Sequence, residues 1–353
     1  MGKQKLLSIV IPVYNNGRYI YQCLSSILQQ DINFNDIEIV CINDGSTDNS
    51  LEEINRVEMD YDFEINIVNK ENTGVSESRN VGIKSATGKF IWFIDSDDYI
   101  EKKSLKKIID ILENKNADIY IMGYNLVDDN GKKIKSIKEY NDNNRYDEIL
   151  KNGRFNCVWQ LIISKDFIIE NDFKFNKQYI IAEDMLFNLD MISTKPKIYY
   201  IDTIVYNYRN NINGIMNSIN IVKLEKKIEN TIDAYYLYFD YIKKWDIDNE
   251  YNRTLVSIKF FNMLSSEVKN IIKLRKSKEY KIKKIDDILK NNKVIYAKSQ
   301  MKEEKGLLLE ARMLYKNKIK LYYIFRTLKD KVKNIIEKGK KHGKNRNINN
   351  KWL

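Results

Sequence analysis

The chain has 353 residues, of which 43% are hydrophobic and 31% are charged, with only 2 prolines and 13 glycines. This length allows two domains with a core each, and the composition excludes a disordered or collagen-like protein. The formal net charge of +11 arises entirely in residues 316–353, which carry 13 Lys and Arg against 2 Asp and Glu. The preceding residues are neutral overall, so nucleic-acid binding by the main body is not expected.

Charged and amide side chains interrupt every hydrophobic run well before membrane-spanning length, so no transmembrane helix is expected. The apolar run 6–13 is followed at once by Tyr14-Asn15-Asn16, which is not a cleavage site, so we expect no signal peptide. Three widely spaced cysteines indicate reduced thiols in a cytoplasmic protein, namely Cys23, Cys41 and Cys157.

Residues 5–122 alternate short runs rich in Ile and Val with helical patterns. The runs predict buried strands over Leu6–Ile11, Ile37–Ile42, Ile65–Val68, Phe90–Ile94 and Ile119–Met122. Helices are predicted over residues 19–28, 48–57, 75–86 and 102–114. This alternation predicts an α/β fold with a Rossmann-like, mostly parallel open sheet.

The rest of the chain changes character twice. Residues 123–215 are irregular, whereas the region from residue 221 onward is helical, with helices predicted over 222–245, 251–275, 279–290, 302–315 and 319–338. We therefore predict three regions: an N-terminal α/β domain over 1–215, a helical domain over 216–315 and a basic amphipathic tail over 316–353.

Polar motifs follow the first four predicted strands. In order they are Pro12-Val13-Tyr14-Asn15, Asn43–Ser50, Asn72-Thr73-Gly74 with Ser78-Arg79-Asn80, and Asp95-Ser96-Asp97-Asp98. Open α/β sheets bind ligands at the carboxyl ends of their strands, so these motifs predict a ligand site. The chain lacks a G-x-G-x-x-G motif after the first strand and a P-loop motif anywhere, which disfavours dinucleotide binding and P-loop chemistry.

The aspartate cluster carries the strongest chemical signal. Asp95, Asp97 and Asp98 repel one another unless a cation or hydrogen-bond donors compensate them, and such oxygen ligands suit Mg²⁺ or Mn²⁺. The alternative is a helix N-terminal cluster. Simpler interpretations also exist for an Asp44-Gly45 turn, for Gly82 at a helix end and for Arg79 on a helix surface.

Together these four motifs resemble those of the family 2 glycosyltransferases, in the family's order and spacing over residues 5–100. Weaker resemblance continues through Val158-Trp159 and Glu183–Phe187 to Tyr208-Arg209. The family consists of inverting, nucleotide-sugar-dependent enzymes with the GT-A fold. The chain departs from the family pattern at Ser78, where Ala is usual, and at residues 160–163, which affects expectations about acceptor recognition.

The resemblance implies a role for each matching residue. Tyr14 would pack on the nucleotide base, Asp44 would hydrogen-bond uracil, and Asp95 would face the ribose. Asp97 would hold the metal against the diphosphate, and Asp184 would be the catalytic base. The implied donor-binding set is Pro12, Tyr14, Asp44, Asn72, Gly74, Arg79 and Asp95.

The residue inventory points independently to a carboxylate base. The single histidine, His342, lies in the basic tail, and the carboxylates outside the metal cluster are Asp184, Glu183, Asp190 and Asp166. Apolar neighbours of Asp184 could raise its pKa toward neutrality, although a Glu-Asp pair stabilised by a helix dipole is an equal alternative on composition alone. Trp159 is by default a core aromatic rather than a sugar platform, and Arg209 is either structural or close to the diphosphate.

These observations predict a cytoplasmic, inverting glycosyltransferase that uses a UDP-sugar and Mg²⁺ or Mn²⁺. The acceptor would be a hydroxyl of a glycan or lipid-linked oligosaccharide for cell-surface polysaccharide, which rests on the family analogy. The alternatives are a nucleotidyltransferase and a non-enzymatic scaffold that binds nucleic acid or membrane through its basic tail.

The tail has its own pattern. Apolar residues recur at helical spacing between lysines and arginines, namely Ile319, Leu321, Ile324, Phe325, Leu328, Val332, Ile335 and Ile336. A basic amphipathic helix with a polybasic extension predicts contact with an anionic membrane surface through residues 319–346. The alternative is that the apolar stripe packs on the protein's own helices.

Overall fold

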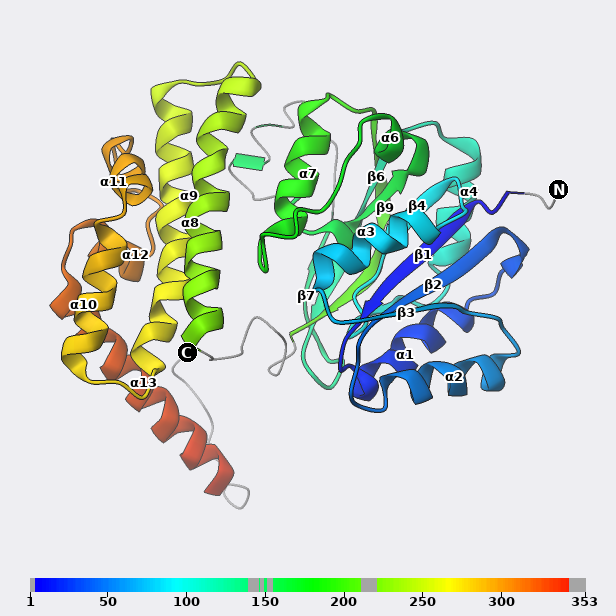
Figure 1. The fold of residues 1–353 in the computed structure, drawn as a ribbon, viewed down its shortest axis with the longest axis horizontal. Helices are drawn as coiled ribbons and strands as arrows, with labels where there is room; N and C mark the ends of the chain where they lie inside the picture. The colour runs from blue at the N-terminus through cyan, green and yellow to red at the C-terminus, as the bar shows by residue number, and fades with distance from the viewer. Residues whose placement is uncertain (1–3, 139–145, 147–148, 151–154, 211–220, 343–353) are drawn as a thin grey trace. The chain divides into compact units, whose positions relative to one another are not determined.

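The computed structural model describes residues 4–138, 146, 149–150, 155–210 and 221–342. The chain divides into two compact units, Met1–Ser218 and Ile219–Leu353, which are coloured blue to green and yellow-green to red in Figure 1. The boundary predicted between residues 215 and 216 lies outside the described residues.

The first unit contains one sheet with the strand order β3-β2-β1-β4-β8-β6-β9-β5, and β7 also pairs with β6. Its first four strands are parallel neighbours and confirm the sequence prediction: β1 (Leu7–Val13), β2 (Ile37–Asp44), β3 (Asn66–Lys70) and β4 (Phe90–Phe93). Because they are parallel, their carboxyl ends lie at one edge of the sheet.

The other half of the sheet is mixed. Strand β8 runs antiparallel to both β4 and β6, β6 is parallel to β9, and β5 is antiparallel to β9. These strands span β5 (Tyr99–Ile100), β6 (Ile119–Val127), β7 (Lys133–Ile137), β8 (Leu161–Ser164) and β9 (Ile198–Arg209). The irregular region 123–215 therefore completes the sheet.

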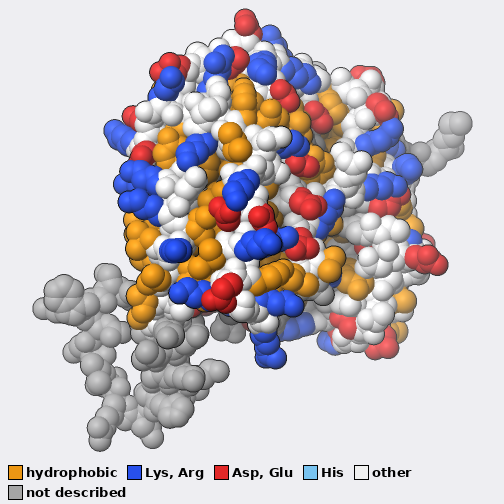
Figure 2. All heavy atoms as spheres, turned by 60° about the vertical axis from the view of Figure 1, so that its left-hand side comes forward, with side chains coloured by type: hydrophobic (Ala, Val, Ile, Leu, Met, Phe, Trp, Pro, Cys, Tyr) orange, Lys and Arg blue, Asp and Glu red, His pale blue; other side chains and the backbone are white. Residues whose placement is uncertain are grey.

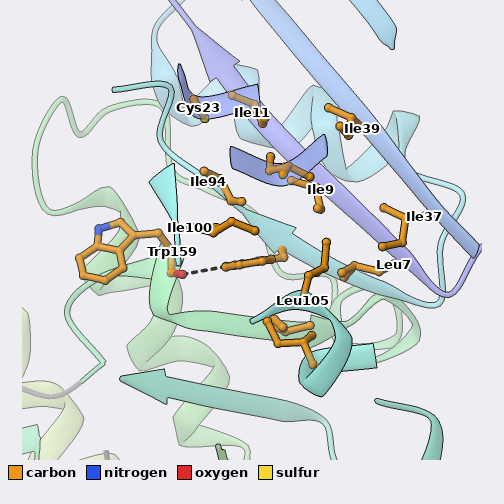
Figure 3. Packing of buried hydrophobic residues seen from close by; sticks show 14 of the residues in the cluster. Leu7, Ile9, Ile11, Cys23, Ile37, Ile39, Ile94, Ile100, Leu105 and Trp159 are labelled. Carbon is orange, nitrogen blue, oxygen red and sulfur yellow. Dashed lines mark hydrogen bonds between the residues drawn. The ribbon is translucent and has the colours of Figure 1, made fainter. Parts of the chain in front are cut away.

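Helices cover both faces of this sheet (Figure 1). On one face, α1 (Gly17–Leu28), α2 (Ser50–Tyr61) and α4 (Leu105–Asn114) pack on alternate strand residues, as Figure 3 shows for Leu7, Ile9 and Ile11 of β1. The other helices of this unit are α3 (Val75–Ser85), α6 (Lys165–Glu170) and α7 (Glu183–Ser193), and the short 3₁₀ helices are η1 (Phe34–Asp36) and η3 (Val158–Gln160). Because successive side chains of a strand point to opposite faces of the sheet, every second residue of β1 packs against this layer of helices.

Gly82 does not stand at a helix end, as we expected, but inside α3. A Cβ atom on Gly82 would lie 2.2 Å from Cγ1 of Val10 in β1. The missing side chain allows α3 to approach the central strand closely.

The second unit is helical, with α8 (Ile221–Lys244) and α9 (Glu250–Lys273) lying side by side (Figure 1). The remaining helices are α10 (Lys278–Leu289), α11 (Asn292–Ser299), α12 (Leu309–Tyr315) and α13 (Ile319–His342). The predicted helix 302–315 is shorter, because residues before Leu309 are not helical. No helix in the described ranges is both long and apolar enough to cross a membrane.

Candidate active site

Polar side chains join the carboxyl ends of the first strands. After β1, the side-chain oxygen of Asn15 accepts a hydrogen bond from the Thr47 amide at 2.8 Å, and the Gly17 amide donates to Asp48 at 3.0 Å. The side chain of Asn16 donates to Ser96 Oγ, after β4, at 2.6 Å. The segments that follow β1, β2 and β4 therefore form one connected edge.

Asp44, the last residue of β2, organises the next loop. Its buried carboxylate accepts hydrogen bonds from the amides of Thr73 and Gly74, both at 2.9 Å, and pairs with Lys70. Gly74 has φ +92°, a left-handed conformation that favours glycine, and α3 begins directly after it. Asp44 is thus more than a turn residue, because it holds the loop that carries Asn72 beside the strand ends.

Tyr14 and Pro12 lie at the end of β1. The Tyr14 side chain is 42% exposed, whereas Pro12 is half-buried. An exposed ring beside the connected strand ends is available to stack on a planar ligand. Asn72 is also exposed, and it lies two residues before Gly74, after which α3 begins.

Arg79 of α3 is buried, contrary to the surface-residue alternative. Its Nη1 donates to Oε1 of Glu183 at 2.8 Å, and its Nη2 donates to Oδ1 of Asp95 at 3.1 Å. Arg79 therefore connects the aspartate cluster after β4 to the first turn of α7. Sequence analysis had no signal for this pairing, because Glu183 is 104 residues away.

Asn80, the neighbour of Arg79, fixes the segment before α7. Its side-chain amide exchanges two hydrogen bonds with the backbone of Phe175, each at 2.9 Å. The Phe175 ring stacks on Phe187 of α7, with ring centroids 3.9 Å apart, and lies under the Arg79 guanidinium. The Arg-Asn pair thus positions the start of α7, a role that sequence analysis missed.

Asp184 lies in the first turn of α7 and is half-buried. Burial raises its pKa to about 7, with the charge of Glu183 adding to the rise and that of Arg79 opposing it. The helix begins after Ala182, a non-glycine residue in the left-handed conformation with φ +63°. A carboxylate with a near-neutral pKa can accept a proton near physiological pH.

Asp98 is the structural member of the aspartate cluster. Its buried carboxylate accepts hydrogen bonds from the Tyr206 hydroxyl at 2.8 Å and the Arg209 amide at 2.7 Å. The Arg209 guanidinium donates to the carbonyls of Asp97 and Asp129, each at 2.8 Å, and to Gln22. Arg209 thus holds the loop in place, which favours the structural alternative over contact with a diphosphate.

Asp97 is half-buried and lies between Asp95 and Asp98. Burial, and to a lesser extent the charges of Asp97 and Asp95, raise the pKa of Asp98 well above its usual range. Within the described ranges, no three His, Cys, Asp or Glu side chains gather as a metal-binding group. A Mg²⁺ ion held mainly by substrate phosphates needs only one or two protein carboxylates, a requirement that Asp97 and Asp95 fit.

Trp159 is a core residue, as expected by default. Its buried ring stacks on Tyr206 and on Tyr208, with centroid distances of 4.5 and 5.2 Å. Its carbonyl accepts a hydrogen bond from Trp92 at 2.9 Å, which is the dashed line in Figure 3. The stack braces β9 behind the aspartate cluster and leaves no face of Trp159 open to a sugar.

Comparison with known proteins agrees with this architecture. A family model described as glycosyl transferase family 2 matches residues 8–172, a segment that ends before Glu183 and Asp184. Glycosyltransferase GlyG of Streptococcus pneumoniae is 32% identical over 174 residues, which are 49% of this chain and 52% of GlyG. The poly(ribitol-phosphate) β-N-acetylglucosaminyltransferase TarS of Staphylococcus aureus is 30% identical over 37% of this chain and 23% of TarS. The matches thus span about half or less of these curated relatives.

Solved structures support the fold. The crystal structure of S. aureus TarS 1–349 in complex with UDP-GlcNAc has a TM-score of 0.63 at 21% identity and covers 92% of each chain. A mannosyltransferase from Pyrobaculum calidifontis in complex with GDP-Man and Mn²⁺ has a TM-score of 0.51 at 12% identity, covering 93% of this chain and 87% of its own. At these identities the likeness shows the fold, which is GT-A. Over residues 8–172, the sequence matches glycosyl transferase family 2, and the fold agrees with that match.

Proposed function

We propose that this protein is a cytoplasmic glycosyltransferase that moves a sugar from a UDP-sugar to a hydroxyl of a glycan acceptor. The observation that carries the proposal is the Arg79 bridge. It joins Asp95, at the ligand-binding edge of the sheet, to the helix turn that contains Glu183 and Asp184. One buried cation would thus hold the proposed donor site and the proposed base together.

The nucleotide half of the donor would occupy the connected strand ends. The exposed ring of Tyr14 would stack on the base. The lone pairs of the Asp44 carboxylate that the Thr73 and Gly74 amides leave free would accept a hydrogen bond from uracil. Asp95 would face the ribose, with Pro12, Asn72, Gly74 and Arg79 lining the same edge. UDP-GlcNAc is the first donor to test, because it is the donor in the TarS complex.

Asp184 would act as the general base. The acceptor hydroxyl would transfer its proton to Asp184 while its oxygen forms a bond to the anomeric carbon of the donor. The bond from that carbon to the diphosphate would break on the opposite side, so that UDP departs and the configuration inverts. The near-neutral pKa of Asp184 supports this role, because the ionised form then remains available at physiological pH.

Asp97 would hold a Mg²⁺ or Mn²⁺ ion, with Asp95 beside it. Such an ion would act as a Lewis acid that neutralises the charge developing on the departing diphosphate. Three aspartates within four residues, of which Asp95 and Asp97 are half-buried, support a cation at this loop. Asp98 itself would stay out of the coordination, because Tyr206 and Arg209 occupy its oxygens.

The acceptor would be a glycan or a lipid-linked oligosaccharide for cell-surface polysaccharide. The names of two relatives contain poly(ribitol-phosphate). A polyol-phosphate polymer should therefore be tested as an acceptor alongside the glycans. Residues 160–163, which depart from the family pattern, are part of η3 and β8 and are buried, so they would act on acceptor binding only indirectly.

The test is to incubate the protein with a panel of UDP-sugars and Mn²⁺ and to measure the release of UDP. Asp184→Asn keeps the shape of the side chain but cannot take a proton, so kcat should fall about 10²- to 10⁴-fold with little change in UDP affinity. The matched control is Asp190→Asn, an exposed position in the same helix, which should retain activity.

A parallel loss of UDP affinity and kcat in Asp184→Asn would contradict the base assignment and make Glu183 the next candidate. Release of sugar 1-phosphate rather than UDP, as expected when the UMP group is transferred, would instead support the nucleotidyltransferase alternative.

A further inference from the structure

Helix α13 has one exposed apolar face, which we call the α13 stripe: Leu321, Ile324, Leu328 and Val332. Their exposed fractions are 48%, 50%, 57% and 55%, and their spacing of three or four residues places them on the same side of the helix. Tyr322, on another side, is fully buried and packs α13 into the second unit. The alternative that the whole apolar stripe packs on the protein's own helices is therefore wrong for these four residues.

A groove of about 380 Å³ borders this stripe. It lies between α9, α12 and α13, and its charged lining is Lys269, Glu310, Arg326 and Lys329, so cations outnumber anions. Its wall also includes Phe325 and Lys329 of α13, which are one position from Ile324 and Leu328. Because successive helix residues are about 100° apart, these groove residues lie on the flank of α13 next to the stripe, not on the stripe itself.

The charged side chains of the groove pair with one another. Glu310 pairs with Arg326 at 3.2 Å and with Lys329 at 2.8 Å, while Arg326 also pairs with Asp330. Three cations, Lys269, Arg326 and Lys329, thus face two carboxylates, Glu310 and Asp330. An anionic group in the groove would therefore meet a net positive charge even though Glu310 is present.

Further lysines surround the stripe. Lys318 and Lys320 are exposed just before it, and Lys329 is exposed beside Leu328. Figure 2 shows a face on which hydrophobic areas lie among Lys and Arg side chains and also among Asp and Glu side chains. Apolar residues that enter the boundary of a lipid bilayer, with lysines that reach its headgroups, are the arrangement of an interfacial helix.

We propose that the α13 stripe and its groove dock the second unit on an anionic lipid bilayer, with a headgroup phosphate in the groove. The stripe would enter the acyl boundary, and Lys269, Arg326 and Lys329 would surround the phosphate. A second copy of the chain is a poorer occupant, because stripe-to-stripe pairing would bring the same cations together. Nucleic acid would match the charge but leave the apolar stripe exposed. This proposal does not depend on the enzymatic activity.

The test is co-sedimentation of the full chain with vesicles of phosphatidylglycerol and phosphatidylcholine, compared with phosphatidylcholine alone. The protein should bind the anionic vesicles, and added salt should weaken the binding. The double variant Leu321→Gln/Leu328→Gln should bind about tenfold more weakly, because it removes apolar contacts. Lys318→Gln, Lys320→Gln and Lys269→Gln should each lower the affinity for anionic vesicles about fivefold.

The matched control is Ile134→Gln/Ile169→Gln, which changes two residues of the first unit that are 56% and 57% exposed. It should leave vesicle binding unchanged. A second measurement uses the wild-type chain alone: anionic vesicles should slow hydrogen exchange of the α13 amides.

Three outcomes would overturn the proposal. The wild-type chain could fail to sediment with anionic vesicles at low salt, the control could weaken binding as much as the stripe variant, or α13 exchange could stay unchanged with vesicles present. Sedimentation equilibrium tests whether a second copy of the chain covers the stripe instead. A dimer of the wild-type chain that dissociates in the stripe variant would assign this face to a second copy.

Discussion

Arg79 of α3 and Glu183 of α7 form a buried ion pair across 104 residues of sequence, with 2.8 Å between Nη1 and Oε1. The same guanidinium contacts Asp95, while its Nε has no hydrogen-bond partner among the described residues. A buried cation between two carboxylates stabilises the fold only while its geometry is kept, since an unpaired buried charge is costly. The pair therefore links the stability of the first unit to the assembly of the candidate active site.

Arg79→Lys keeps the charge but cannot make the two-pronged contact, because an ammonium group lacks the planar fork. We expect the free energy of unfolding to fall by about 2–4 kcal/mol, measured by urea denaturation. The control is Arg56→Lys, in a solvent-exposed pair with Glu53, where the change should be close to zero. Equal effects at the two positions would contradict the role assigned to Arg79.

The pH dependence of turnover should reflect Asp184. Its pKa of about 7 means that the carboxylate becomes protonated as the pH falls below 7, and a protonated base cannot accept the acceptor's proton. We expect kcat to decline about tenfold per pH unit on the acidic side. The measurement is a pH–rate profile of UDP release. A profile that stays flat down to pH 5 would contradict the assignment.

The same pKa predicts that the stability of the protein falls with rising pH, whereas kcat rises. Folding raises the pKa of Asp184 above its unfolded value, so the folded state favours the protonated form and the stability that it contributes is lost as the pH rises through 7. Asp184→Asn should therefore raise the free energy of unfolding at pH 8 by on the order of 1 kcal/mol, and with it the Tm. The substitution should have little effect at pH 4. Thermal unfolding at both pH values checks this. A gain of equal size at both pH values would exclude titration of Asp184 as its cause.

Metal dependence should pass through Asp97. Asp97→Asn removes one negative charge from the loop, so Mn²⁺-supported UDP binding should weaken at least about tenfold. Calorimetric titration of UDP with and without Mn²⁺ measures this, and the exposed Asp172→Asn serves as the control. Full activity in EDTA, or in the Asp97→Asn variant, would refute the metal site.

Gly82→Ala should destabilise the first unit by about 1–3 kcal/mol, because the added Cβ would lie 2.2 Å from Val10. The double variant Gly82→Ala/Val10→Ala should recover part of that loss, since the smaller side chain makes room. A double-mutant cycle from urea unfolding measures the coupling. Additive losses would show that the helix moves away from β1 instead.

Many features of the fold were predictable from local pattern. The runs of Ile and Val identified β1, β2 and β4, and the Asp, Asn and Gly residues that follow them marked the ligand edge, because parallel strands end together. The irregular region 123–215 offered only short apolar runs at 158–163 and 197–206, which overlap β8 and β9 but do not reveal how these strands pair. Its strands pair antiparallel as well as parallel, and pairing partners are set by contacts far apart in the sequence.

The amino-acid sequence by itself determined which side chains could do chemistry: an aspartate cluster, a Glu-Asp pair and no histidine outside the tail. Only the tertiary structure decided their roles, since a carboxylate's pKa and partners depend on groups brought close by folding. Asp98 is committed to Tyr206 and Arg209, whereas Asp184 is desolvated beside Glu183 and Arg79. Identical side chains thus receive different functions because burial and charge are properties of a place in the fold rather than of a position in the chain.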